Sequence, residues 1–336
     1  MISRKITSNE AGQRFDKYLK KLLKDAPDSF LYKMLRKKNI VLNGKRSDGR
    51  EVLCIDDEVK FFLSDDTFEK FQGKTVDRFG HADQYSQSYQ KLKKLQIIYE
   101  NEHILVVNKP AGILSQKAAP DDVSINEWFI GYLLSQHVIE PDSLLTFKPS
   151  ICNRLDRNTS GMVVCGKTLA GTQYLTRIIK EKTLEKYYYC LVSGTITIQE
   201  RLTGYLYKNM AQNKVTIYQN KVEIPDFLVK DAVFIDTAFQ SKYSANNITL
   251  LEIQLFTGKT HQIRAHLAAL GCPIIGDTKY GNPTINKIYE KKGVKNQMLH
   301  AHKLIFPTTS DQTFSDTSGK ILECPMPSIF EKILNS

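Results

Sequence analysis

The sequence predicts an α+β fold, in which a mixed, mostly antiparallel sheet with flanking helices is preceded by a small α/β domain. From about Leu95 onward, short apolar segments of strand type mix with amphipathic segments of helix type. No regular βαβ rhythm joins them, which argues against a parallel sheet. A chain of 336 residues is long enough for about two domains. We therefore divide it into a small domain at residues 1–64, a polar linker at 65–94 and a large domain at 95–336.

The small domain is predicted to begin with two helices and to end with two strands. In RFDKYLKKLL (residues 14–23) and FLYKMLRKKN (30–39) the apolar residues recur at helical spacing. IVLNGKR (40–46) predicts a strand that enters an Asn-Gly turn, and DDEVKFFL (56–63) predicts a second strand.

Positive charge is concentrated in this small domain. Its first 64 residues hold 15 Lys and Arg against 9 Asp and Glu, so +6 of the chain's net charge of +11 lies there. Such an excess indicates a polyanionic partner, although a charged helix face that is merely solvated is the simpler alternative. The cations expected to form one phosphate-binding face are Arg36, Lys37, Lys38, Lys45, Arg46 and Arg50.

Residues 65–94 lose hydrophobic periodicity and are rich in Gln, Ser, Asp and Lys, so we interpret them as a linker. Three aromatic residues, Phe68, Phe71 and Phe79, could dock on a neighbouring surface. We therefore do not expect the whole segment to be disordered.

The large domain shows clear strand and helix patterns. Strands are predicted in QIIYENEHILVVNKP (two strands, 96–110), GMVVCGK (161–167), EKYYYCLVSG (185–194) and NNITLLEIQLFTG (246–258). Helices are predicted in TLAGTQYLTRIIKEK (168–182) and in THQIRAHLAALG (260–271), which ends at Gly271 with Pro273 following.

Several classes of protein are disfavoured. No apolar stretch approaches the ~18 residues of a membrane span, and the N-terminus has no apolar segment typical of a secretory signal. We therefore expect a cytoplasmic protein. The six cysteines include no C-x-x-C pair, which argues against a disulfide framework and against a thiolate zinc site.

Two segments that look like ligand-binding motifs do not match the full pattern of those motifs. Gly258, Lys259 and Thr260 resemble a phosphate-binding loop, but Ile253 stands where that motif needs its first glycine. His261 and His266 are five residues apart, not the four of the usual zinc motif, and structural histidines are the commoner explanation for His300 and His302. We expect neither a metal nor a cofactor.

One acidic residue has two arginines close to it in the sequence. In NRLDRNTSG (153–161), Asp156 lies between Arg154 and Arg157. A surface ion pair, worth about 0 to 1 kcal/mol, is one interpretation, and a carboxylate kept ionised for chemistry is the other. Arg264 falls in the first turn of a predicted helix, where the helix dipole disfavours a cation, so it needs an anionic neighbour. Asp156 is the candidate.

A tyrosine run lies inside a predicted strand. Because side chains alternate along a strand, Tyr187 and Tyr189 should share one face while Tyr188 lies on the other.

Five segments occur in the order found in the RluA-type pseudouridine synthases, to which this sequence is similar over roughly residues 95–310. They are LVVNKPAGI, NRLDRNTSG, EKYYYCLVSG, TGKTHQIRAHLAALGCPIIGDTKYG and MLHAHKLIFP. The small domain resembles the RNA-binding domain named after ribosomal protein S four. The resemblance implies a mixed, mostly antiparallel sheet around a central RNA-binding cleft.

The resemblance also implies roles for five residues. Asp156 would be the catalytic carboxylate, acting as nucleophile at the ribose or as base on its carbon 2. Arg264 would hold that carboxylate ionised, since an adjacent guanidinium can lower a carboxylate pKa by about 1 to 3 units. Tyr188, in a K-x-Y pattern, would stack on the target base and could remove its carbon 5 proton. Arg154 would fill the space left by the flipped base. Lys109 would shape a strand exit or contact phosphate.

Outside these five residues the family pattern is largely kept. Asp277 and Tyr280 are expected to brace the fold. The departures are Asn153 in place of histidine, Lys259 in place of arginine and Cys190 in place of alanine. They leave the acid, the tyrosine and the partner arginine in place.

The expected function is RNA pseudouridine synthesis by a monomer, most readily on large-subunit (23S) ribosomal RNA. A transfer RNA synthase of the same family is the first alternative. The second, from another class, is an RNA-binding ribosome-assembly factor whose catalysis is incidental.

Overall fold

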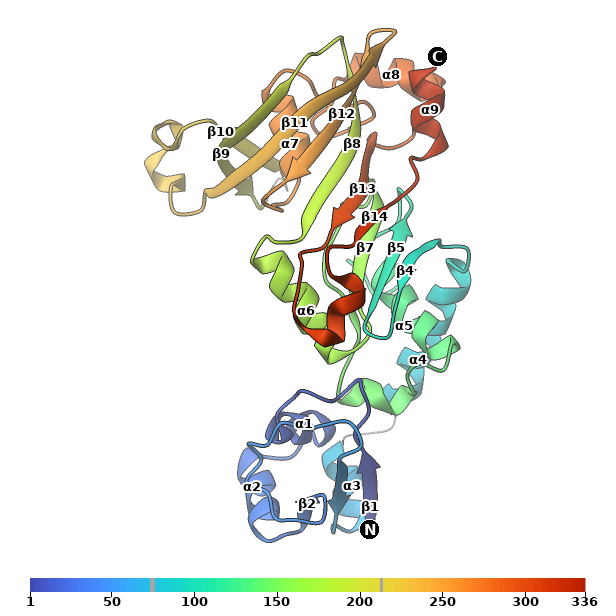
Figure 1. The fold of residues 1–336 in the computed structure, drawn as a ribbon, viewed down its shortest axis with the longest axis vertical. Helices are drawn as coiled ribbons and strands as arrows, with labels where there is room; N and C mark the ends of the chain where they lie inside the picture. Colours follow the sequence, from blue (N-terminus) through green and yellow to red (C-terminus); the bar gives the residue numbers. More distant parts are fainter. Residues whose placement is uncertain (73–75, 212–213, 336) are drawn as a thin grey trace.

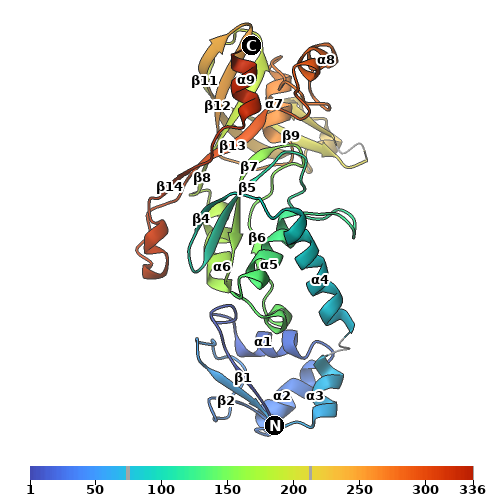
Figure 2. The same cartoon turned by 90° about the vertical axis from the view of Figure 1, so that its right-hand side faces the viewer.

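The computed structural model describes residues 1–72, 76–211 and 214–335. It contains a three-stranded sheet near the N-terminus and an eleven-stranded sheet formed by the rest of the chain. Figures 1 and 2 show the N-terminal unit at one end of an elongated molecule, with the long sheet rising away from it. This is the predicted α+β fold.

The N-terminal unit packs its helices on a small antiparallel sheet with strand order β1-β3-β2. Its elements are β1 (Ile2–Lys5), α1 (Phe15–Leu22), α2 (Asp28–Arg36), β2 (Ile40–Leu42), β3 (Glu58–Phe61) and α3 (Asp65–Gln72). The apolar faces predicted for both helices are buried together, with Phe15, Leu19 and Leu35 almost completely inaccessible. The predicted helices and strands are confirmed, whereas β1 was not predicted.

The predicted linker contains two helices, α3 and α4 (Val76–Lys91). Phe68 belongs to the core of the N-terminal unit, and the ring of Phe71 lies 4.4 Å from that of Phe30. Further along, Tyr85 is buried against α5 (Ile125–Ser135). The side chain of Phe79 lies outside the described part of the structure. This segment is therefore largely helical, and both of its ends pack on neighbouring elements.

The large sheet has the order β10-β9-β11-β12-β8-β13-β7-β5-β4, with β6 paired to β7 and β14 paired to β13. Among its described pairs, only β13 and β7 run parallel. Its strands are β4 (Ile97–Glu100), β5 (Ile104–Lys109), β6 (Ser150–Ile151), β7 (Ser160–Gly166), β8 (Glu185–Ser193), β9 (Gln199–Asn209), β10 (Lys214–Tyr218), β11 (Val233–Ala245), β12 (Ile248–Leu255), β13 (Leu299–Ile305) and β14 (Ile321–Glu323).

Helices surround this sheet (Figure 1). Besides α4 and α5 they are α6 (Leu169–Lys180), α7 (Gln262–Ala269), α8 (Pro283–Lys291) and α9 (Ser328–Leu334), with 3-10 turns at Pro141–Leu145, Lys221–Glu223, Asp226–Leu228 and Gln312–Thr317. Both helices predicted from the large domain's sequence, α6 and α7, are confirmed. No helix in the described ranges combines the length and apolarity needed to cross a bilayer.

The centre of the sheet is buried on both faces. On β5, Leu105 and Val107 face the cluster that includes α5, while Ile104 and Val106 face the cluster that includes α6. Strand β7 alternates in the same way. Covering both faces explains why these strands are continuously apolar and do not alternate with polar residues.

A close contact fixes the start of β7. Gly161 has φ +112°, and a Cβ atom there would lie 2.3 Å from the carbonyl oxygen of Ala301 on β13. Only glycine fits this approach. Ser160 Oγ also lies 2.9 Å from His300 Nδ1. The loop that precedes β7 is thus attached to a strand near the C-terminal end of the chain.

Candidate active site

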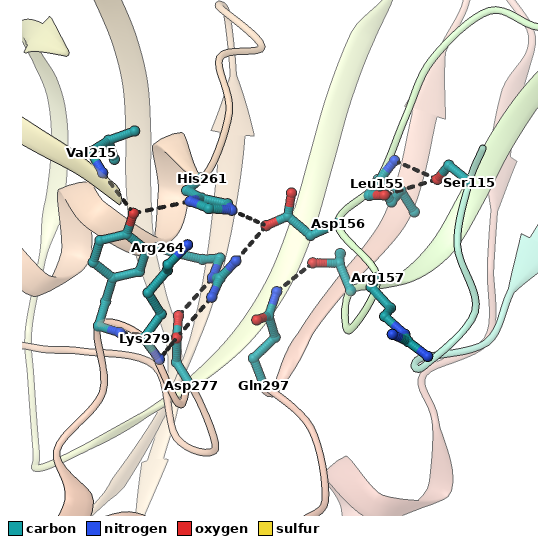
Figure 3. A network of polar contacts seen from close by, with 12 residues as sticks. Ser115, Leu155, Asp156, Arg157, Val215, His261, Arg264, Asp277, Lys279 and Gln297 are labelled. Carbon is teal, nitrogen blue, oxygen red and sulfur yellow. Dashed lines mark hydrogen bonds and ion pairs between the residues drawn. The ribbon is translucent and has the colours of Figure 1, made fainter. Parts of the chain in front are cut away.

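Asp156 lies in the loop between β6 and β7, and neighbouring polar groups fix that loop. The hydroxyl of Ser115 donates to the carbonyl of Leu155 (2.8 Å) and accepts from its amide (3.0 Å). On the other side, Gln297 Nε2 donates to Thr159 Oγ1 (2.7 Å). Figure 3 shows Ser115 beside Leu155, and Gln297, close to Asp156. The carboxylate is thereby presented from a loop with little freedom to move.

Arg264 binds Asp156, as the sequence predicted. Its Nη1 donates to Asp156 Oδ2 at 2.7 Å (Figure 3). The guanidinium also forms a two-point contact with Asp277, through Nε (2.7 Å) and Nη2 (2.9 Å). A guanidinium held by two parallel hydrogen bonds has a fixed orientation. Asp277 therefore aims Arg264 at Asp156.

Burial and neighbouring charges shift the pKa values of Arg264 and Asp277 in this cluster. Burial alone would lower the pKa of Arg264, but the hydrogen bonds and charges of Asp277 and Asp156 raise it overall. Burial acts on Asp277 in the opposite sense, and Arg264 together with two backbone amides lowers the pKa of that carboxyl. Arg264 is in the first turn of α7, so the two carboxylates also offset its unfavourable position near the helix N-terminus.

The two arginines that flank Asp156 in sequence do not hold it. Arg154 is exposed, and Arg157 donates from Nε to the carbonyl of Gly112 (3.1 Å). No ion pair within 4.0 Å joins either of them to Asp156 in the described structure. The arginines next to Asp156 in sequence therefore do not form an ion pair with it, and Arg264 does.

Tyr188 lies on β8 with the predicted alternation. It is buried and lines the same cleft as Asp156, whereas Tyr187 and Tyr189 are half-buried on the opposite face. Burial, helped by the charge of Asp156, raises the pKa of Tyr188. The side chain is therefore a neutral phenol at physiological pH, with its ring available to a bound base.

Lys109 requires a correction. Its side chain is completely buried, and its ammonium donates to the carbonyls of Pro110 (3.1 Å), Ile113 (2.8 Å) and Arg157 (3.0 Å). All three of its donors are used inside the protein, so the predicted contact with RNA phosphate is wrong for this structure. Lys109 instead ties the exit of β5 to the loop that contains Asp156.

A large basic cleft surrounds the site. Its volume is about 1220 Å³, above the roughly 300 to 1,000 Å³ of a small-molecule pocket. Among the described residues that line it, Asp156 is the one carboxylate. The cations are Lys117, Arg154, Lys180, Lys182, Lys186, Lys208, Lys259 and Arg264. Such a cleft favours a polyanion, with one acid at its centre.

The predicted cations of the N-terminal unit lie elsewhere. Arg36, Lys37, Lys38, Lys45 and Arg46 are all exposed around the end of α2 and the turn after β2. The described structure offers none of these five an acidic partner within 4.0 Å. They form a second basic surface, separate from the lining of the cleft.

Sequence reasoning missed two features of the site. Asp277 was expected to brace the fold, and it does so by orienting Arg264. His261 was considered only as a metal ligand, yet its Nε2 lies 4.0 Å from Asp156 Oδ2. The available signal was its position directly before α7, three residues ahead of Arg264. In the described ranges no group of three or more His, Cys, Asp or Glu residues is placed to hold a metal ion.

The chain is similar to known proteins over most of its length. The family model described as RNA pseudouridylate synthase matches residues 103–269. An uncharacterized RNA pseudouridine synthase of Mycoplasma genitalium is 31% identical over 315 residues, covering 92% of this chain and 90% of that protein. The ribosomal large subunit pseudouridine synthase C of Vibrio vulnificus is 28% identical, covering 98% of this chain and 95% of that one.

One solved structure shows the same fold. Human RNA pseudouridylate synthase domain containing 4 aligns with a TM-score of 0.57 at 20% identity, covering 75% of this chain and 96% of that one. The sequence relatives and the family model show that this chain belongs to the family of RNA pseudouridine synthases.

Proposed function

We propose that Asp156 is the catalytic carboxylate with which this pseudouridine synthase isomerises uridine. The observation that supports this most directly is its setting: the one described carboxylate in a basic cleft, hydrogen-bonded to an arginine that Asp277 orients. The reaction breaks the bond from ribose to base nitrogen 1, turns the base and rejoins it through carbon 5. It is an isomerisation and consumes no co-reactant, so one positioned acid is sufficient.

Arg264 is proposed to hold the carboxylate in place. Its Nη1 contacts only one oxygen of Asp156, Oδ2. A cation fixed in this way can stabilise the negative charge that returns to the carboxylate when its bond to the ribose breaks.

Tyr188 is proposed to stack on the extruded uracil. The raised pKa argues for this role, because it leaves less phenolate at neutral pH to accept the carbon 5 proton. Its buried position in the cleft supplies a flat apolar wall on which a base can stack.

Arg154 is proposed to enter the RNA helix. The target base must leave its stack to reach Asp156, and Arg154 is exposed at the cleft two residues before that acid. Its planar guanidinium suits stacking between bases.

The proposed substrate is large-subunit (23S) ribosomal RNA. Relatives named ribosomal large subunit pseudouridine synthase C are similar along nearly their whole length, N-terminal unit included. The exposed cations of the N-terminal unit, which we propose to be an RNA-binding domain like that of ribosomal protein S four, would grip phosphates outside the cleft. We also propose that the protein acts in the cytoplasm as a monomer, with residues 1–64 and 95–336 as its domains.

Tritium release from RNA labelled at uridine carbon 5 tests these assignments. Wild-type protein should release tritium from a transcript of 23S ribosomal RNA, and Asp156→Asn should release none. Asp236→Asn is the matched control, because it removes a carboxylate that Arg201 binds outside the cleft lining. Release by Asp156→Asn at the wild-type rate would refute its role. Release from transfer RNA alone would identify a transfer RNA synthase of the same family.

A further inference from the structure

Two side chains beside Asp156 have no part in the function proposed above. His261 directly precedes α7 with φ +55°, a backbone conformation that residues other than glycine seldom adopt. Its Nε2 lies 4.0 Å from Asp156 Oδ2, and its Nδ1 lies 3.0 Å from the hydroxyl of Tyr280. Figure 3 shows the imidazole of His261 facing the carboxylate of Asp156.

The hydrogen bonds favour one of the two neutral tautomers of His261. The amide of Val215 donates to the hydroxyl oxygen of Tyr280 at 3.0 Å, so this oxygen already accepts one hydrogen bond. The phenolic proton is then free to be donated to Nδ1 of His261, which must be unprotonated to accept it. A neutral imidazole in this state carries its proton on Nε2, and that N–H points toward Asp156.

The charges around the ring favour its neutral form. Burial is the largest influence, and it lowers the pKa of His261. The cations Arg264 and Lys279 act in the same direction, while the carboxylates Asp156 and Asp277 act against them. At neutral pH the imidazole therefore offers one N–H donor without adding a second full positive charge beside Asp156.

The two oxygens of Asp156 have different surroundings. Arg264 Nη1 and His261 Nε2 both approach Oδ2. No described side chain donates a hydrogen bond to Oδ1, which points away from both groups (Figure 3). A separation of 4.0 Å is too long for a hydrogen bond, but such contacts in substrate-free active sites often tighten when substrate binds.

We propose that His261 is a positioning residue whose Nε2–H, set by the hydrogen bond from Tyr280 to Nδ1, holds Oδ2 of Asp156 and directs Oδ1 at the ribose of the target uridine. The proposal rests on the function proposed above, in which Asp156 reacts with the substrate. It adds which oxygen reacts and which residues determine that choice.

Paired substitutions at position 261 test it. His261→Gln keeps an amide N–H close to the place of Nε2, whereas His261→Asn is too short to reach Asp156. Asparagine tolerates positive φ better than glutamine, so a purely structural role would favour His261→Asn. We expect the single-turnover rate on 23S transcripts to fall about 10- to 100-fold in His261→Asn, as for loss of a hydrogen bond to a charged group. His261→Gln should recover much of that loss, with RNA affinity unchanged in both.

Tyr280→Phe tests the proton position separately. It removes the donor to Nδ1, so both neutral tautomers become accessible, and we expect a rate about threefold to tenfold lower at unchanged RNA affinity. In wild-type protein with ¹⁵N-labelled histidine, the His261 signals should show an unprotonated Nδ1 and a protonated Nε2. Tyr280→Phe should shift this population toward the other tautomer.

The outcomes distinguish a failure of this inference from a failure of the catalytic role proposed for Asp156. A rate for His261→Asn equal to or above that of His261→Gln, or a protonated Nδ1 in the wild type, would overturn the inference. If Asp156→Asn is inactive in the same assay, the proposed function still stands after such a result. If Asp156→Asn is fully active, both fail. Thermal melting of each variant identifies any loss of rate that comes from unfolding, and the NMR measurement on wild-type protein needs no variant.

Discussion

Breaking the buried pair of Arg264 and Asp277 should strongly destabilise the large unit. Asp277 has a fully buried side chain and accepts four hydrogen bonds, from Arg264 Nε and Nη2 and from the backbone amides of Lys279 and Tyr280. The substitution Asp277→Asn keeps the shape and one oxygen, but it removes the charge and turns an NH₂ group toward the guanidinium.

The expected loss follows from this burial. Removing one partner of a buried ion pair costs about 3 to 5 kcal/mol, because the other charge is left without compensation. At about 2 to 4 °C per kcal/mol for a domain of roughly 150 to 250 residues, the melting temperature should fall by about 6 to 20 °C. Tritium release should also fall at temperatures where the variant is folded, because Arg264 loses the contact that aims it at Asp156.

The chain supplies a matched control. Arg201 binds Asp236 with the same two-point geometry, at 2.9 and 2.6 Å, but the Arg201 side chain is 58% exposed, whereas that of Asp236 is 11% exposed. Because water can hydrate Arg201 when its partner is lost, Asp236→Asn should lower the melting temperature much less than Asp277→Asn. Differential scanning calorimetry of both variants makes the comparison. Equal shifts would refute the reasoning, since geometry and not burial would then determine the contribution.

Two further outcomes test other charged groups. Burial lowers the pKa of Lys109 to about 7, against an opposing effect of Asp156. The unfolded chain, with an ordinary lysine pKa near 10.5, then binds more protons between pH 7 and 10.5. Wild-type stability should therefore rise with pH in this window, and urea unfolding of Lys109→Met should lack that rise; parallel pH profiles would contradict the assignment. In the N-terminal unit, replacing Lys37 and Lys38 by Gln should reduce the slope of log affinity against log salt by about 1 to 2. Lys60→Gln, whose ammonium already lies 3.0 Å from Glu58, should change it less, and an unaltered slope in the double variant would mean that these lysines do not contact phosphate.

The local pattern of the sequence was sufficient for much of the fold. Helices α1 and α6 and strands β5 and β7 have apolar residues at strict helical spacing or in continuous buried runs, and each was predicted. Strand β9, QERLTGYLYKN, was not predicted. Its residues are mostly exposed or half-buried, and its pairing with β10 and β11 holds it in the sheet. Pairing between distant segments leaves little trace in either segment alone.

The site, like the fold, has some features that the local sequence could predict and others that it could not. The contact between Asp156 and Arg264 could be predicted because a cation in the first turn of a helix needs an acid nearby. The contact by which Asp277 orients Arg264 could not be predicted, since it depends on the fold of the turn that follows α7. Of the two roles expected for Lys109, shaping the strand exit and contacting phosphate, the structure shows the first. The alternation of β5 favours it, since Lys109 lies on the same face as Leu105 and Val107, which belong to the core that includes α5.

The contact at Gly161 has a consequence for synthesis of the chain. The segment that ends the Asp156 loop is held from 297–301 by three contacts: Gln297 to Thr159, His300 to Ser160, and the close approach of Ala301 to Gly161. A nascent polypeptide still lacking these later residues has the acid and the braces from Ser115 and Lys109, but it lacks the contacts that hold the end of the loop. The loop should thus take its final shape only after residues 297–301 have been synthesised, so that a shorter nascent chain on the ribosome cannot yet modify RNA around it.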